Sequence, residues 1–179
     1  MSARLRLGIS ACLAGQSVRY DGAHKRVDAL LADFDPHVTW VTVCPEVESG
    51  MGAPRPPIRL EGAGGGEVRA IDFTRERADL GPALRAFSAR RLADLTALHG
   101  FVLKSRSPSC GPGDAPLHAA DGRVVSTADG LFAAALRATL PCLPVASEED
   151  LATPWARAAF LARCRERRCA SGQSRSKGE

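Results

Sequence analysis

Six cysteines carry the clearest chemical signal in this chain, because thiolates are both nucleophiles and soft metal ligands. Three of them, Cys12, Cys44 and Cys110, lie at the end of, or in the loop after, segments expected to be strands. The other three are expected to start a strand or to lie on a last helix and tail: Cys142, Cys164 and Cys169. No pair has CxxC spacing, so a zinc ribbon, a thioredoxin-like motif and a ferredoxin-type run are not indicated. The fold must therefore assemble any shared site.

Three thiolates at one place would bind zinc, copper(I) or an iron-sulfur cluster. Around zinc they would leave one coordination position open. Around a four-iron cluster they would leave one iron without a protein ligand, able to bind a substrate as a Lewis acid. Spacing alone does not choose between these metals. Gly15, Pro45 and Gly111 lie close to the three cysteines in sequence, and such residues shape loops that approach a ligand closely.

Polar residues near these cysteines in sequence could complete a site. Glu46 follows the second cysteine by two residues and can act as a general acid or base. Ser107 and Ser109 precede the third cysteine and offer hydroxyls, although turn hydrogen bonding is the ordinary role of such serines. The loop after the first cysteine carries donors suited to a polar or anionic ligand, namely Arg19, Tyr20, Asp21, His24 and Lys25. Capping by Asp21 with solvated charges is the ordinary alternative there.

An alternation of strands and helices is expected to bring these residues together. Short apolar runs predict buried strands over residues 5–10, 38–43, 100–104 and 142–145. Helical periodicity predicts helices over residues 25–34, 80–98, 129–140 and 155–168, with Gly100 ending the second. A glycine-rich tip predicts a hairpin between residues 58–60 and 68–71. The pattern indicates an α/β fold with a single doubly wound, Rossmann-like, mostly parallel sheet and helices on both faces. Ligands bind such sheets outside the carboxyl ends of the strands.

Charge is distributed unevenly along the chain. Residues 1–161 hold 18 Lys and Arg and 18 Asp and Glu, so the formal charge of +4 comes from residues 162–179. We therefore expect an α/β domain over 1–161 and a basic, disordered tail over 162–179, too polar to join a core. Since the tail lacks interleaved aromatic residues, nucleic acid is not expected as a partner.

Apolar runs are far shorter than the roughly 20 residues that span a bilayer, so no membrane association is expected. No export signal is visible, and six cysteines in such a chain are more often thiols or metal ligands than disulfides. A cytoplasmic location is therefore the expectation. The oligomeric state cannot be deduced from these features.

Five sequence blocks, in order, resemble the thiouracil desulfurase (TudS-like desulfidase) family, formerly a domain of unknown function. They are Ser10-Ala-Cys-Leu-Ala-Gly, Val18-Arg-Tyr-Asp-Gly-Ala-His-Lys, Val43-Cys-Pro-Glu-Val-Glu-Ser-Gly with Pro54-Arg, Gly100-Phe-Val-Leu-Lys-Ser-Arg-Ser-Pro-Ser-Cys-Gly and Asp129-Gly-Leu-Phe-Ala. The resemblance covers about residues 5–146. It does not extend to the basic C-terminal segment.

The resemblance implies an iron-sulfur enzyme that removes sulfur from a small thiolated pyrimidine, either thiouracil or a thiouridine nucleotide. It implies a [4Fe-4S] cluster held by Cys12, Cys44 and Cys110, whose fourth iron takes the thiocarbonyl sulfur while water attacks the carbon, without net redox change. Glu46 matches the family's catalytic carboxylate and Ser107 its active-site serine, with Ser109 as the second choice. A nucleotide would need a cation for its phosphate, and the candidates are Arg19, Lys25, Arg55 and Lys104.

Two other classes of protein remain open at this point. A cysteine-nucleophile hydrolase would use Cys110 as nucleophile, His24 as base and Asp21 to orient the base. A non-catalytic protein would hold a structural metal on the three thiolates and contact RNA through its basic tail, although structural zinc requires a fourth ligand that is not evident.

Overall fold

Four parallel strands form the central sheet of the computed structural model, which describes residues 4–62, 66–74 and 76–175, with side chains as far as residue 169. The strands are β1 (Leu5–Ser10), β2 (Val38–Val43), β5 (Gly100–Leu103) and β8 (Val145–Ser147), in the order β2-β1-β5-β8. Every neighbouring pair in this sheet is parallel. The predicted α/β class with a mostly parallel sheet is confirmed.

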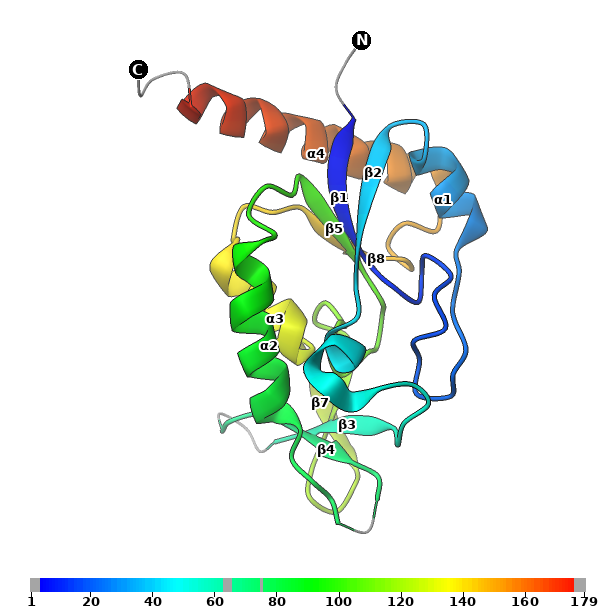
Figure 1. The fold of residues 1–179 in the computed structure, drawn as a ribbon, viewed down its shortest axis with the longest axis vertical. Helices are drawn as coiled ribbons and strands as arrows, with labels where there is room; N and C mark the ends of the chain where they lie inside the picture. Colours follow the sequence, from blue (N-terminus) through cyan, green and yellow to red (C-terminus); the bar gives the residue numbers. More distant parts are fainter. Residues whose placement is uncertain (1–3, 63–65, 75, 176–179) are drawn as a thin grey trace.

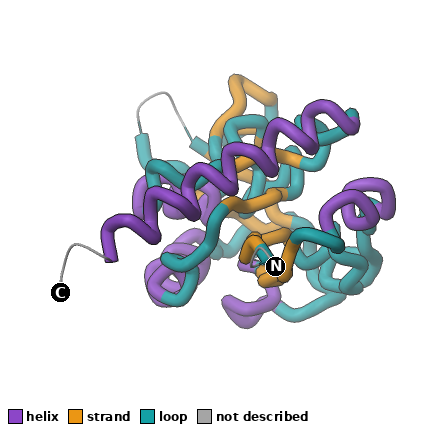
Figure 2. Tube along the Cα trace, turned by 90° about the horizontal axis from the view of Figure 1, so that it is seen from above, coloured by secondary structure: helices purple, strands orange, loops and turns teal. Residues whose placement is uncertain are grey.

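Helices cover both faces of this sheet (Figure 1). One face packs against α1 (Asp28–Phe34) and α4 (Pro154–Arg175), which enclose side chains such as Leu7. The other packs against α2 (Gly81–Ala93) and α3 (Leu131–Thr139), around Phe101 and Leu103. Seen from above, the strands lie between the helices, and the long helix leading to the C-terminus crosses over them (Figure 2).

A glycine in β1 lets the two central strands pack tightly. Leu7 and Ile9 point toward the first face and are fully buried. A side chain at Gly8, between them, would point to the opposite face, where the Phe101 ring fills that space. A Cβ atom at Gly8 would lie 2.3 Å from this ring. Gly8 is therefore required by the packing of β5 on β1.

A second sheet lies beyond the carboxyl end of the first (Figure 1). It contains β3 (Ile58–Glu61), β4 (Arg69–Asp72), β6 (Ala115–His118) and β7 (Val124–Ala128) in the order β4-β3-β6-β7. The predicted hairpin is its β3-β4 pair. The β6-β7 hairpin was not predicted from the sequence, which indicated a single sheet. Leu60, Leu84 and Leu131 join this sheet to α2 and α3 in a separate apolar cluster.

Several element boundaries differ from the sequence prediction. The first helix begins at Asp28 rather than residue 25, because the N–H groups of Lys25 and Val27 donate hydrogen bonds to the carbonyls of Cys12 and Leu13. The second helix ends at Ala93. Residues 94–98 continue as turns in which an N–H bonds to the carbonyl three residues earlier, and Leu95 and Leu98 remain buried. The last strand begins at Val145, so Cys142 lies in an exposed turn instead of starting a strand.

Residues 162–175 of the expected tail belong to α4, which continues to Arg175, and residues 176–179 lie outside the described part of the chain. Phe160, Leu161 and Cys164 lie on one face of this helix and are buried in the core. Helical spacing of these three residues outweighs the polar composition around them. None of the helices in the described part of the chain is long and apolar enough to cross a membrane.

Cys164 and Cys169 offer a matched test of this helix, since Cys164 is fully buried and Cys169 is exposed. Cys164→Ala should lower the free energy of unfolding by about 1–2 kcal/mol, because it leaves a small cavity. Cys169→Ala should change it by less than about 0.5 kcal/mol. Urea unfolding of the metal-free protein measures both. Equal effects would contradict the packing of α4 described here.

Candidate functional site

Cys12, Cys44 and Cys110 meet in one cavity of about 280 Å³ outside the carboxyl ends of β1, β2 and β5. Each follows a different strand of the parallel sheet, so the sheet itself brings the three together. The other residues lining the cavity are Ser10, Ala11, Val18, Arg19, Tyr20, Val43, Pro45, Glu46, Arg55, Pro57, Ile58, Lys104, Arg106, Ser107 and Pro108. Pro57 and Ile58 show that the second sheet supplies one wall.

Backbone contacts fix the loop around each cysteine. The carbonyl of Cys12 accepts a hydrogen bond from the Lys25 N–H at 2.9 Å, which closes the loop between them. The N–H of Cys44 donates to Glu48 Oε1 at 2.8 Å, at the start of the short helical segment η1 (Val47–Met51). The Cys110 loop packs against Gly130, where a Cβ atom would lie 2.4 Å from the backbone of Ser109.

All three thiols are in surroundings that disfavour the thiolate when no metal is present. Burial raises the pKa of Cys12 to about 11, and the neighbouring Cys44 adds to this effect. Burial also raises the pKa of Cys44, and it raises that of Cys110 well above its usual value. Three thiolates could share this cavity only with a cationic partner. Among the described residues, no three Cys, His, Asp or Glu side chains approach closely enough to hold one single metal ion.

Ser10 links β5 to the third cysteine and was missed by the sequence analysis. Its hydroxyl accepts a hydrogen bond from the backbone N–H of Lys104 at 3.0 Å. It also makes a hydrogen bond with the side chain of Cys110 that favours the thiolate. Ser10 is almost completely buried at the end of β1. Its position at a strand end, two residues before Cys12, is the signal that could have identified it.

Glu46 is held from two sides at the cavity wall. Arg55 donates to its Oε2 through Nε at 2.8 Å and Nη2 at 2.6 Å, and both side chains are mostly buried. Ser109 donates its hydroxyl to Oε1 of the same carboxylate. These bonds fix the orientation of the carboxylate beside the cysteines.

Arg55 also joins the loops that surround the cavity. Its Nη1 donates to the carbonyls of Val18, at 2.9 Å, and Gly52, at 2.7 Å. Its backbone N–H donates to the Tyr20 carbonyl at 2.9 Å. Arg55 therefore connects the loop after β1 with the segment after β2. From the sequence, Arg55 was expected only as a phosphate ligand, but four of its five N–H donors are already engaged.

The two predicted serines have different surroundings. Ser107 lines the cavity, and its Oγ accepts hydrogen bonds from the N–H groups of Ser109, at 3.3 Å, and Cys110, at 3.1 Å. Its O–H remains able to donate toward the cavity. Ser109 is fully buried and uses its hydroxyl on Glu46. The expectation that Ser109 contacts a substrate therefore does not match its position.

The loop after Cys12 divides into residues inside and outside the cavity. Arg19 and Tyr20 line it, with the Arg19 guanidinium 5.3 Å from the centre of the Tyr20 ring. Asp21, His24 and Lys25 are exposed and do not line it. Asp21 caps its own turn by accepting the Ala23 N–H at 3.1 Å, which is the ordinary role considered above.

The catalytic set expected for a cysteine hydrolase is not assembled. His24 is exposed, and its Nδ1 accepts the Arg26 N–H at 3.3 Å. Cys110 is buried in the cavity, which His24 does not line. The two residues are therefore not placed to exchange a proton.

Known proteins resemble this chain in sequence and in fold. The 2-thiouracil desulfurase family matches residues 7–149. The uncharacterized protein YbbK of Bacillus subtilis (strain 168) is 31% identical over 110 residues, which cover 59% of this chain and 72% of YbbK. A solved structure of a [4Fe-4S]-dependent thiouracil desulfidase, TudS, has a TM-score of 0.65 at 30% identity and covers 89% of this chain and 99% of its own. This chain belongs to the 2-thiouracil desulfurase family.

Proposed function

We propose that this protein is a [4Fe-4S]-dependent desulfidase that hydrolyses the carbon–sulfur bond of a small thiolated pyrimidine. The observation that carries the proposal is the meeting of three cysteines from three parallel strands in one cavity, beside a fixed carboxylate. The likeness to TudS, which is [4Fe-4S]-dependent and acts on thiouracil, supports the cofactor and the substrate class. The free cysteines suit a reducing compartment, and we place the activity in the cytoplasm.

The donor set fits such a cluster. Cys12, Cys44 and Cys110 are free thiols that face one cavity, and thiolates are the usual ligands of iron-sulfur clusters. When bound by three thiolates, a [4Fe-4S] cluster supplies one iron without a protein ligand, a soft Lewis acid for the substrate's sulfur. Cys142, Cys164 and Cys169 do not line the cavity and are not proposed as ligands.

Glu46 is proposed as the acid and base of the reaction. In the overall change, water adds to the thiocarbonyl carbon, the carbon–sulfur bond breaks, and sulfur leaves as hydrosulfide, with no change in oxidation state. The attacking water must lose protons, and a carboxylate at the cavity wall can accept one. The hydrogen bonds from Arg55 and Ser109 hold Glu46 in position for this transfer.

Ser107, Arg19 and Tyr20 are proposed to bind the substrate. The free O–H of Ser107 can donate to a pyrimidine oxygen or nitrogen, and the Tyr20 ring offers an apolar face. Arg19 lines the cavity and is suited to the phosphate of a nucleotide. Lys25 lies outside the cavity, and Arg55 and Lys104 are held in mostly buried, hydrogen-bonded ion pairs. Arg19 is paired less closely, with the half-exposed Asp21 at 3.4 Å, so it is the preferred phosphate candidate among the four considered.

Anaerobic reconstitution with iron and sulfide tests the proposed function. A brown protein that releases sulfide from 2-thiouracil or 4-thiouridine monophosphate is expected. Comparing the two compounds ranks base against nucleotide. Uptake of zinc, without iron binding or sulfide release, would overturn the proposal in favour of a structural metal.

Single substitutions of the cysteines should separate ligands from other thiols. Cys12→Ser, Cys44→Ser and Cys110→Ser should each abolish cluster retention, because a hydroxyl is a poor ligand for iron in a cluster. Cys142→Ser and Cys169→Ser are matched controls at exposed positions and should retain iron fully. Iron content and visible absorbance provide the measurement. Full iron and activity in any of the first three variants would remove that residue from the ligand set.

Glu46→Gln should retain the cluster and lose activity by a factor of about 10²–10⁴, since the amide cannot accept a proton. Sulfide release at saturating substrate, normalised to iron content, measures the effect. Asp94→Asn, at an exposed carboxylate, is the control. Unchanged turnover in Glu46→Gln would exclude Glu46 from proton transfer.

Ser109→Ala should lower kcat by roughly 10-fold and leave KM for the substrate unchanged, because it loosens the Glu46 carboxylate without touching the cavity. Steady-state kinetics on the reconstituted protein distinguish the two parameters. Ser126→Ala, on an exposed strand of the second sheet, is the control. A change confined to KM would instead support direct contact between Ser109 and the substrate.

A further inference from the structure

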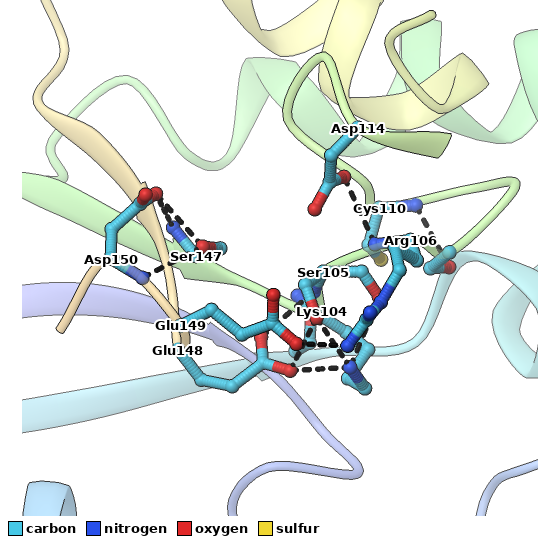
Figure 3. A network of polar contacts seen from close by, with 11 residues as sticks. Lys104, Ser105, Arg106, Cys110, Asp114, Ser147, Glu148, Glu149 and Asp150 are labelled. Atoms are coloured by element: carbon cyan, nitrogen blue, oxygen red, sulfur yellow. Dashed lines mark hydrogen bonds and ion pairs between the residues drawn. The ribbon is translucent and has the colours of Figure 1, made fainter. Parts of the chain in front are cut away.

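An ion pair between Lys104 and Glu148 borders the cysteine cavity (Figure 3). Lys104 follows β5 and Glu148 follows β8, which are parallel neighbours with Leu103 paired to Ser147. The two residues therefore leave adjacent strands at the same edge of the sheet. Neither belongs to the residues proposed above to bind the cluster or the substrate.

The ammonium group of Lys104 is completely engaged by the protein. It donates to the Ser105 carbonyl at 3.0 Å, to Ser105 Oγ at 2.8 Å and to Glu148 Oε1. These contacts use its three donors, so it has none left for a substrate phosphate. Lys104 is instead a positive charge held in one place.

Glu148 is equally constrained. Its Oε2 accepts the Ser105 N–H and its Oε1 accepts the Ser105 hydroxyl, both at 2.7 Å. The following turn is closed by Asp150, which accepts the Ser147 N–H and hydroxyl at 2.8 Å each. Burial alone would raise the pKa of Glu148, but the hydrogen bonds from Lys104 and Ser105 outweigh it and lower this pKa. Glu148 therefore stays ionised and keeps Lys104 in place.

Lys104 is the member of the ion pair on the cavity side. It lines the cavity and Glu148 does not. The backbone N–H of Lys104 adds a second link to this wall, because it donates to the hydroxyl of Ser10, which also lines the cavity. Lys104 is thus tied to the cysteine cavity by its side chain and by its backbone.

A cluster held by three thiolates would carry net negative charge, and hydrosulfide released from the substrate would add to the negative charge in the cavity. Net charge and hydrogen bonding around the sulfur ligands set the reduction potential of such clusters. A fixed cation at the cavity wall stabilises the more negative state, whereas a mobile surface lysine is screened by water and salt.

We propose that Lys104, held by Glu148, is a positioning residue whose charge would offset the negative charge of a cluster bound by the three cysteines and of the hydrosulfide released beside it. This inference rests on the proposed function. It predicts that the two members of the pair have opposite electrostatic effects, although each stabilises the local structure.

The midpoint potential of the reconstituted cluster tests the proposal. Lys104→Met should shift it to more negative values, because a positive charge is lost. Glu148→Gln should shift it to more positive values, because the amide still accepts a hydrogen bond but carries no charge. The double variant should lie between the two. Arg123→Met, at an exposed cation on the second sheet, is the control and should match the unmodified protein.

Sulfide release provides a second readout, and Lys104→Met should lower it by about 10- to 100-fold per cluster. Shifts of the potential in the same direction in both single variants, or no shift, would overturn the inference. If Lys104→Met does not fold, Lys104→Gln replaces it. Glu148→Gln alone still tests the direction in which the midpoint potential shifts. Failure of the unmodified protein to bind a cluster would overturn the proposed function as well. If the unmodified protein binds a cluster and releases sulfide, but the variants do not change the midpoint potential, only this inference is overturned.

Discussion

Burial of three thiols at the edge of one parallel sheet is the constraint on which the rest of the site depends. Parallel strands end at the same edge, so residues that follow β1, β2 and β5 are neighbours although nearly 100 positions separate the first cysteine from the last. Burial raises the pKa of each thiol. Ionising all three in one cavity requires a cation, so the proposed metal centre would stabilise the fold as well as support the chemistry.

Two buried ion pairs surround this cavity and hold functional groups in place. Arg55 fixes Glu46 and ties together the loops after β1 and β2. Glu148 fixes Lys104 at the ends of β5 and β8. Both members of the first pair line the cavity, whereas only Lys104 of the second pair does. The proposed chemistry uses both a negative and a positive charge, since water must give up protons while negative charge accumulates on sulfur.

Much of this arrangement could be predicted from the sequence, because strand ends are local signals. The positions of Cys12, Cys44 and Cys110 after apolar runs indicated a common edge, and they line one cavity. Contacts between distant segments were not predictable in this way. Ser109 donates to Glu46 across 63 positions, which no periodicity encodes. Similarly, Cys164 is buried through the packing of α4, although its neighbours in sequence are charged.

Mössbauer spectroscopy of protein reconstituted with ⁵⁷Fe tests the central claim most directly, because it distinguishes an iron with a free coordination position from those bound by cysteine. The account predicts a cluster in which one of the four irons is distinct and changes its spectrum when 2-thiouracil is added. The other irons should respond much less. Four equivalent irons that do not respond to the substrate, or a protein that binds no iron, would contradict it.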